Sequence, residues 1–376
     1  MSIARGAIIP EPVARQPWGM LIPLFMLVAF GAAVLYSAAG GSMDPYASSH
    51  LIRFCVFLAM AGIIASVPRN FVRLMTYPAY IVVLILLLAV EVLGQVRGGS
   101  QRWLDLGFMV LQPSELMKPV IVLTLALYYS KLPAGLITSW RAVLVPGALI
   151  ALPMGLVLLQ PDLGTSLALA FGGGVVMLLA GLPLRWFIGA GVTAAAAAPV
   201  AFFFALQPYQ QRRVMTMFDP EADPLGAGYH IAQSKIAIGS GGLFGKGFNN
   251  GSQSHLQYLP EPQTDFVFAT MAEEWGLAGG LFVIGVFAII LRWGLRVAYR
   301  SKDRFASLVA AGMTATIFFY VAVNLLMVMG FAPVVGIPLP FMSHGGSSML
   351  TNMICIGALL MVNRWNRNAP RGGLST

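Results

Sequence analysis

The chain has 376 residues, of which 58% are hydrophobic and only 10% are charged. A water-soluble domain needs more charge than this to cover its surface, so the composition excludes an ordinary soluble enzyme. Both cysteines, Cys55 and Cys355, lie inside apolar runs, which makes a disulfide or a thiolate metal site a poor interpretation. The composition therefore predicts an all-α, polytopic integral membrane protein.

Apolar runs long enough to cross a bilayer as helices recur along the whole chain. The first run follows Arg5 and Arg15, but it is too long for the apolar core of a secretory signal peptide, and we interpret it as an uncleaved span. Proline and glycine residues mark the boundaries within a single membrane domain, 1–376. About ten spans are expected: 18–39, 50–67, 75–94, 114–130, 142–159, 165–181, 185–206, 265–291, 305–329 and 346–363.

The basic residues predict the orientation of these spans. With the N-terminus placed in the cytoplasm, fifteen of the 23 lysine and arginine residues fall on the cytoplasmic side. The positive-inside rule then places both termini in the cytoplasm. Most acidic residues fall on the opposite, outer side, so polar chemistry is expected there. The net charge of +9 is mainly a signal of topology, and nucleic-acid binding is a poor explanation for it.

The motif "LQPSELMKP" (111–119) opens the fourth expected span. Ser114 is expected to cap this helix. Glu115 and Lys118 are three residues apart, so they share a helix face and can form an ion pair. Pro119 has no N–H, which leaves the carbonyl of Glu115 available to another partner. The pair is either a structural lock between helices or part of a site beside a polar cavity.

Two turns on the outer side carry further candidates. In "GGSQRWLDLG" (98–107), Arg102 is either an interfacial anchor or a ligand of a lipid phosphate. In "QPDLGT" (160–165), Asp162 can cap the first turn of the next span.

The one long hydrophilic segment, 207–264, is expected to be a functional outer loop because it far exceeds an ordinary connector. Its glycine-rich part, "GSGGLFGKGFNNG" (239–251), lacks the Walker pattern, since Gly247 stands where Ser or Thr should follow the lysine. It is either a flexible loop or a loop that also approaches a lipid pyrophosphate with Lys235 or Lys246.

The eighth expected span begins in "LPEPQTDFVFATMAEEWG" (259–276). Thr264 or Asp265 can cap it. Glu273 and Glu274 lie about two turns further on and on other faces of the helix, so they are expected to make polar helix contacts. Asp265 is therefore either a cap or a catalytic group that acts without a second carboxylate from its own helix.

Five segments in this order resemble the SEDS family of membrane proteins, most closely its cell-elongation branch: "QPSELMK", "QPDLGTS", "QQRRVMTMFDPEADPLGAGYHIAQSKIAIGSGG", "LPEPQTDFVFATMAEEWG" and "GFAPVVGIPLPFMSHGGSS". The resemblance implies a peptidoglycan glycosyltransferase that polymerises lipid II at the outer face of the cytoplasmic membrane. It also implies a divalent cation (Mg or Mn), a class B penicillin-binding protein as partner, and an elongation complex with MreB, MreC and MreD.

By the same resemblance, the family's essential aspartate falls on Asp265, and its polar cavity residues fall on Glu115 and Lys118, with Arg102 and Asp162 as further candidates. Joining an α-linked glycosyl pyrophosphate to a hydroxyl with a β-1,4 product inverts the anomeric carbon, so one base suffices, together with positive charge for the departing pyrophosphate. Asp265 is the expected base, or alternatively a ligand of the cation. Lys118, Arg102, Arg212 or Arg213, together with the cation, are expected to hold the pyrophosphate, and Lys235 is a further candidate.

The chain departs from the family pattern at Gln257, Gln263 and His344, which puts a role for these side chains in doubt. A lipid II flippase and a scaffold without catalytic activity are the alternatives. A transporter should carry ionisable groups near the membrane midplane or on both sides, whereas here the acidic residues crowd the outer half.

Overall fold

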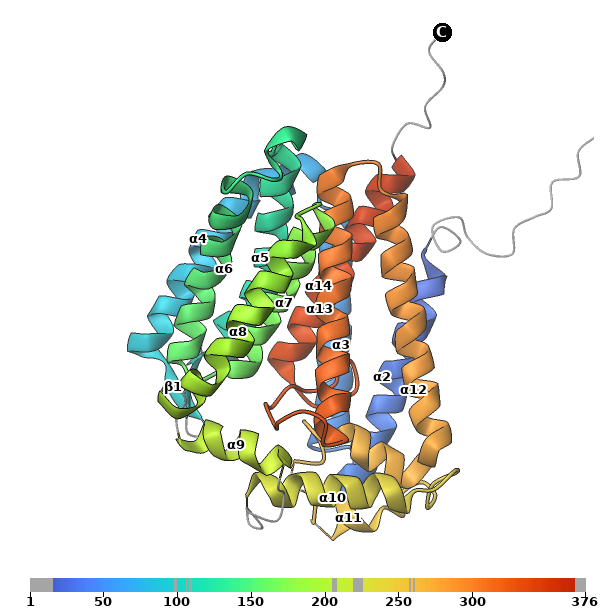
Figure 1. The fold of residues 1–376 in the computed structure, drawn as a ribbon. Coiled ribbons are helices and arrows are strands. Elements are labelled where there is room, and N and C mark those ends of the chain that lie inside the picture. Colours follow the sequence, from blue (N-terminus) through green and yellow to red (C-terminus); the bar gives the residue numbers. More distant parts are fainter. Residues whose placement is uncertain are drawn as a thin grey trace, which may run out of the picture.

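The computed structural model describes residues 16–97, 100–105, 107, 110–204, 208–218, 226–256, 258–259 and 261–368. Within these residues, ten helices of 17 residues or more form an elongated bundle (Figure 1). They are α2 (Trp18–Ala38), α3 (Tyr46–Ser66), α4 (Arg69–Leu93), α5 (Pro113–Lys131), α6 (Arg141–Leu159), α7 (Leu163–Leu179), α8 (Leu184–Phe204), α12 (Val267–Arg300), α13 (Arg304–Val328) and α14 (Gly346–Asn368).

Each of the ten predicted spans coincides with one of these helices, and the prediction of an all-α membrane protein is confirmed. The largest differences in boundaries are in α4, which begins at Arg69 rather than 75, and in α12, which continues to Arg300 rather than 291. Among the described residues, seven helices are long and apolar enough to cross a membrane, and α7 and α8 are shorter apolar helices. The tenth, α5, carries the Glu115 and Lys118 charges.

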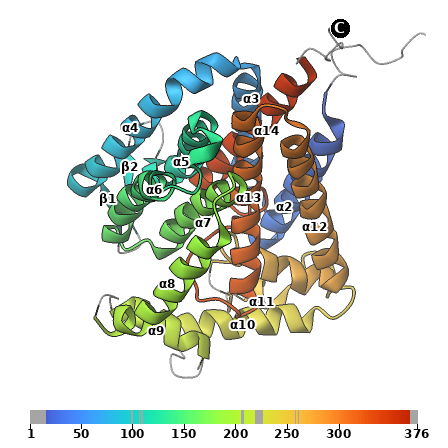
Figure 2. The same ribbon diagram turned by 45° about the horizontal axis from the view of Figure 1, so that its top comes forward.

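The two ends of the bundle differ. The first turn of α2 and the last turn of α14 lie at one end, while the segments between α8 and α12 lie at the other, which we call the loop end (Figures 1 and 2). The described residues of the segment predicted as a long loop include three helices: α9 (Pro208–Phe218), α10 (Ala227–Ser240) and the short α11 (Ser252–His255). The basic residues Arg5 and Arg15, used to predict orientation, lie outside the described residues.

The loop end also holds a small antiparallel sheet in the order β1-β2-β3. Its strands are β1 (Gln95–Arg97), β2 (Ser100–Asp105) and β3 (Val110–Leu111). Gln95 pairs with Trp103, and Leu104 pairs with Leu111. The sheet connects α4 to α5 and brings Arg102 on β2 toward the first turn of α7.

The long helix α12 is broken at Gly276, whose φ of 64° and ψ of −160° fit only glycine. The glycine-rich segment fills the break with main-chain hydrogen bonds. Lys246 and Gly247 donate to the carbonyls of Glu273 and Glu274 at 3.0 and 3.1 Å. Leu277 and Ala278, just after the break, donate to the carbonyls of Gly242 and Leu243 at 2.9 and 3.1 Å. The segment is therefore a structural part of α12, which neither interpretation of the sequence anticipated.

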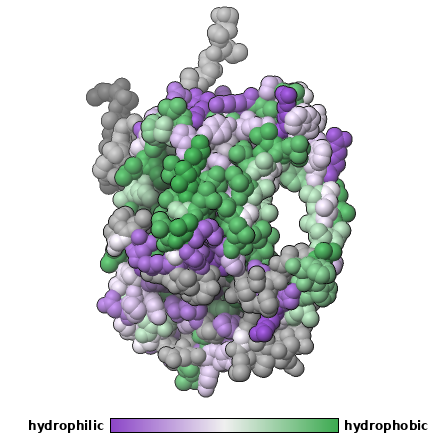
Figure 3. Space-filling view, turned by 90° about the vertical axis from the view of Figure 1, so that its left-hand side faces the viewer, coloured by the Kyte–Doolittle hydropathy of each residue, from purple (hydrophilic) through white to green (hydrophobic). Residues whose placement is uncertain are grey.

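The flank of the bundle is apolar. Figure 3 shows hydrophobic side chains in a broad band between more polar ends, with an opening through the molecule on this face. An apolar cavity of about 670 Å³ lies between α6, α7 and α8, lined by residues such as Ile150, Met177 and Phe187. The apolar band matches what a hydrocarbon environment requires of the outward-facing side chains.

We expect Gly276→Ala to destabilise the protein strongly. A Cβ at this position would lie 2.4 Å from the amide nitrogen of Gly245, and alanine is also strained at this backbone conformation. Gly285→Ala is the matched control, because Gly285 lies in the same helix with nothing within 4 Å of its added Cβ. Thermal unfolding in detergent should show a lower midpoint for Gly276→Ala only. Equal midpoints for the two variants would contradict the role given to the break.

Candidate active site

The first turn of α5 begins differently from the prediction. The helix starts at Pro113, and its N-cap residue is Gln112, which makes no side-chain cap hydrogen bond. Ser114 is therefore not the cap, because proline is already favoured at the first helical position and moves the start of the helix one residue earlier. The Gln112 side chain instead donates to Asp162 at 3.2 Å, which ties α5 to α7.

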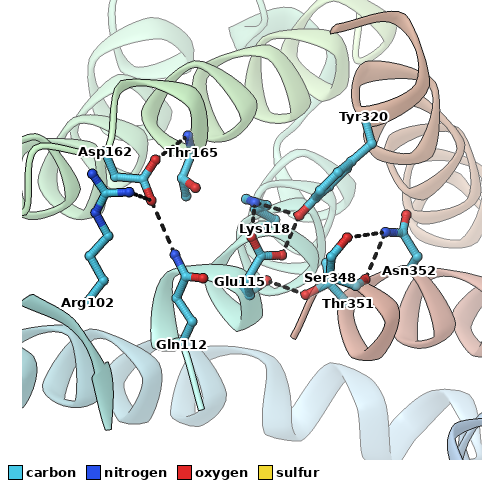
Figure 4. A network of polar contacts seen from close by, with 10 residues as sticks. All are labelled: Arg102, Gln112, Glu115, Lys118, Asp162, Thr165, Tyr320, Ser348, Thr351 and Asn352. Carbon is cyan, nitrogen blue, oxygen red and sulfur yellow. Dashed lines mark hydrogen bonds and ion pairs between the residues drawn. The ribbon is translucent and has the colours of Figure 1, made fainter. Parts of the chain in front are cut away.

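Glu115 and Lys118 form the predicted ion pair. Lys118 Nζ lies 2.6 Å from Glu115 Oε1, and the two residues are only 2% and 7% exposed, respectively. Tyr320 on α13 completes the group, since its hydroxyl donates to Glu115 Oε2 and accepts from Lys118 Nζ (Figure 4). Because a buried charge is costly unless it is paired and hydrogen-bonded, this triad locks α5 to α13.

The predicted consequence of Pro119 is confirmed. The carbonyl of Glu115, which Pro119 cannot bond, accepts a hydrogen bond from Thr351 Oγ1 at 3.1 Å (Figure 4). Thr351 lies on α14, 236 residues further along the chain. The missing N–H of one proline thus creates the polar contact between α5 and α14.

Asp162 and Arg102 meet at the first turn of α7. Asp162 caps this helix as predicted, with its Oδ1 accepting from the Thr165 amide at 3.0 Å. Arg102 donates to the carbonyls of Gln160 and Pro161 and lies 3.6 Å from Asp162 Oδ2. Arg102 is thus held by the turn that precedes α7, and it acts as a structural clamp between the sheet and this turn.

Asp265 lies just before α12 and is half-buried, whereas Glu115 and Asp162 are almost fully buried. The predicted cap is wrong: the N-cap residue is Phe266, and the hydroxyl of Thr264 donates to Glu261 instead. One carboxylate oxygen of Asp265 would be 3.5 Å from a Cβ added to Gly336, so the main chain of the segment before α14 passes close to it.

The same segment contacts the turn that holds Asp162. A Cβ on Gly164 would lie 3.3 Å from both Cβ and the carbonyl oxygen of Val335, the residue before Gly336. Arg102, Asp162, Gln210 and Val335 line a cavity of about 30 Å³, which admits water but no sugar ring. Segment 333–337 therefore connects Asp265 with the Arg102–Asp162 cluster.

The chain around Asp265 is fixed by two side chains and one main-chain amide whose contacts the sequence did not indicate. Ser343 Oγ donates to the carbonyl of Thr264 at 2.6 Å, and the His344 amide donates to the carbonyl of Gln263 at 2.8 Å. Asn324 on α13 donates to the carbonyl of Asp265. All three contacts join residues far apart in sequence, so no local pattern could have revealed them.

His344 has a second role through its ring. Its Nε2 lies 3.1 Å from Arg53 NH1 and accepts from it, because a guanidinium can only donate. Burial, and then the charge of Arg53, lowers the pKa of His344, which keeps the imidazole neutral at neutral pH. The departures at Gln263 and His344 are therefore compatible with the local structure, while Gln257 lies outside the described residues.

Glu273 and Glu274 make helix contacts, as predicted. Glu273 Oε1 accepts from Lys246 Nζ at 2.6 Å and from Ser252 Oγ at 3.0 Å, and Glu274 accepts from Ser37 on α2. The charge of Lys246 is therefore paired with that of Glu273.

The other basic candidates lie on the helices of the loop end. Arg212 on α9 and Lys235 on α10 are exposed. Lys235 lies against Gly330 just after α13, and the helix that carries it is held by a hydrogen bond from Ser234 Oγ to the carbonyl of Val328 at 2.7 Å. Arg213 is on α9, but its side chain is outside what the structure describes. Among the described residues, no group of three or more His, Cys, Asp and Glu could hold a metal ion.

The fold and the site define a class: a polytopic helical membrane protein with a half-buried aspartate, Asp265, at its loop end and buried ionic clusters elsewhere in the bundle. Comparisons with known proteins give the family. A family model described as a cell cycle protein, which covers FtsW, RodA and SpoVE, matches residues 18–368. The chain belongs to this FtsW/RodA/SpoVE family, the SEDS family that the motifs indicated.

Individual relatives match over most of their length. Peptidoglycan glycosyltransferase MrdB of Escherichia coli (strain K12) is 42% identical over 349 residues, which cover 92% of each chain. Stage V sporulation protein E of Bacillus subtilis (strain 168) is 38% identical over 288 residues, 76% of this chain and 77% of the relative.

Solved structures share the fold. A chain of a peptidoglycan synthase complex, solved to explain how polymerization and crosslinking are coordinated, has a TM-score of 0.82 and 31% identity, with 94% of this chain and 99% of that chain covered. The rod shape determining protein RodA of Thermus thermophilus has a TM-score of 0.70 and 29% identity, with 93% and 97% covered.

We expect Lys118→Met to cost about 3–5 kcal/mol of stability, because it leaves Glu115 buried without its cation. The double variant Glu115→Gln, Lys118→Met should recover part of this loss, since it removes the uncompensated charge. Thermal or denaturant unfolding in detergent measures both. A double variant less stable than Lys118→Met alone would contradict the ion-pair interpretation.

Proposed function

We propose that the protein is a peptidoglycan glycosyltransferase that polymerises lipid II into β-1,4-linked glycan strands during cell elongation. The observation that carries the proposal is the 42% identity to a peptidoglycan glycosyltransferase over 92% of both chains. The geometry adds a reactive candidate: Asp265 is half-buried at the loop end, where water, a sugar and a membrane-anchored phosphate can meet.

The reaction requires one proton acceptor. The acceptor sugar's 4-hydroxyl oxygen attacks C1 of the donor sugar, the C1–O bond to the pyrophosphate breaks, and undecaprenyl pyrophosphate leaves with the bonding electrons. Asp265 takes the hydroxyl proton as general base. A single displacement inverts the α-linked anomeric carbon to β, so no second carboxylate is needed as a nucleophile. This agrees with Glu115, Asp162 and Glu273 being engaged in contacts within the protein.

The departing pyrophosphate needs positive charge. Lys118 and Arg102 are held in internal contacts, which favours Arg212, Arg213 and Lys235 on α9 and α10 for this role. A divalent cation, Mg or Mn, fits as a further contribution, because such ions are commonly held by one carboxylate together with substrate phosphates. Asp265 is the residue that would hold it, and the ion would neutralise charge on the pyrophosphate.

The membrane orientation follows from the same reaction. Both termini lie in the cytoplasm, and the loop end with Asp265 faces outward, where the glycan is assembled.

A class B penicillin-binding protein crosslinks the new strand, a pairing supported by the structural likeness to a chain of a peptidoglycan synthase complex. MreB, MreC and MreD complete the proposed elongation complex. A lipid II flippase is disfavoured because the Glu115–Lys118 pair is almost fully buried and Tyr320 bonds to both of its charged groups.

Asp265→Asn tests the proposal, because it keeps the shape of the side chain and removes the base. We expect polymerisation of lipid II to fall by about 10²- to 10⁴-fold, the usual contribution of a general base. Glycan products would be measured on gels, with purified protein and its penicillin-binding partner in Mg or Mn. Asp105→Asn, an exposed carboxylate on β2 of the same loop end, is the matched control and should polymerise at the wild-type rate.

A cation titration separates the two roles of Asp265. If the carboxylate is the base, Asp265→Asn stays slow at every cation concentration, whereas a ligand role predicts recovery at high Mg or Mn. If Asp265→Asn folds, binds its partner and polymerises at the wild-type rate at the usual cation concentration, both the base role and the ligand role of Asp265 are ruled out.

A further inference from the structure

We propose that Asn324 is a positioning residue for Asp265, which it acts on by holding the main chain of Asp265 to the segment that its carboxylate approaches. The inference rests on the proposed role of Asp265 as the reactive carboxylate. It adds a residue on a different helix, α13, to the machinery at the loop end.

The Asn324 side chain is fully buried and makes two long-range hydrogen bonds from one nitrogen. Its Nδ2 donates to the carbonyl of Asp265 at 2.9 Å and to the carbonyl of Ile337 at 2.8 Å. The amide nitrogen has two hydrogens, and both are used. Asn324 thus joins two chain segments that are otherwise separate in sequence, and it does so from inside the bundle.

The Ile337 carbonyl belongs to the segment that the Asp265 carboxylate approaches. Gly336, the residue before Ile337, has a φ of +72°, and a Cβ added to it would be 3.5 Å from Asp265 Oδ2. Fixing Ile337 relative to Asp265 therefore fixes the peptide that the carboxylate packs against. If this bridge is lost, the carboxylate can move relative to that peptide.

The neighbouring contacts do not replace this bridge. Ser343 and His344 hold the carbonyls of Thr264 and Gln263, which precede Asp265. Those bonds fix how the chain enters the site, but they reach neither the Asp265 carbonyl nor Ile337. Ser343 Oγ also accepts from the Leu339 amide at 2.8 Å, so it links Thr264 to the residues just after Ile337. Asn324 differs from it in bonding the Asp265 and Ile337 carbonyls themselves.

The chemistry of the position favours asparagine. A buried amide within an apolar helix is costly unless its donors are paired. Aspartate at 324 would direct a carboxylate toward two carbonyl oxygens and repel them, and leucine would fill the same space without a donor. The direct link between the Asp265 and Ile337 carbonyls thus depends on one NH₂ group.

The test compares Asn324→Leu with Asn352→Leu. Asn352 on α14 is equally buried, but its Nδ2 donates at 2.8 Å to the carbonyl of Ser348, within its own helix. Both variants lose a buried amide, so both should lose similar thermal stability. We expect Asn324→Leu to lower the turnover number for lipid II polymerisation by about 10- to 100-fold, because a displaced catalytic group costs this much. KM should change by less than about twofold, and Asn352→Leu should keep its turnover number within about threefold of the wild type.

A double-mutant cycle separates positioning from general stability. In Asp265→Glu, the carboxylate is already displaced by one methylene group, so adding Asn324→Leu should reduce turnover little further. Additive losses, or equal losses of turnover in Asn324→Leu and Asn352→Leu, would overturn the inference. If Asp265→Asn is inactive while Asn324→Leu turns over like the wild type, only the positioning role fails. If Asp265→Asn is fully active, the proposed function of Asp265 fails first.

Discussion

The constraint on which the structure depends is that main-chain polar groups inside an apolar bundle must find partners within the protein. The break in α12 at Gly276 interrupts the helical ladder, and the segment around Gly245 restores the lost bonds from outside the helix. Main-chain hydrogen bonds thereby join the first half of α12, which follows Asp265, to the glycine-rich segment of the loop end. The position of the candidate catalytic residue is thus a consequence of hydrogen-bond satisfaction.

Buried charges obey the same requirement. Lys118 and Glu115 form an ion pair and both bond to Tyr320, while Glu273 pairs with Lys246. Asp162 forms an ion pair with Arg102 and accepts a hydrogen bond from the first turn of α7. Each of these groups uses its hydrogen-bonding capacity to join segments far apart in the chain or neighbouring helices. They build a rigid frame and so leave the chemistry to residues nearer the surface of the loop end.

This division changes how the family resemblance is applied to individual residues. Lys118 and Arg102 were expected to face a pyrophosphate, yet both donate to groups of the protein itself. In the proposed function, the positive charge offered to a substrate comes instead from Arg212, Arg213 and Lys235 on α9 and α10. A half-buried aspartate at the same end of the bundle as these basic residues is a suitable arrangement for an anionic, lipid-linked sugar donor.

The amino-acid sequence by itself determined the ten apolar helices, the Glu115–Lys118 pair, the Asp162 cap and the carbonyl left open by Pro119. These features depend on spacing within one or two helical turns or on the length of an apolar run, which local sequence specifies directly. Only the tertiary structure decided that Thr351 would take the open carbonyl, that the glycine-rich segment would enter α12, and that Asn324 would bridge Asp265 and Ile337. These contacts arise from the packing of helices far apart in the chain, and no local pattern encodes which partners meet.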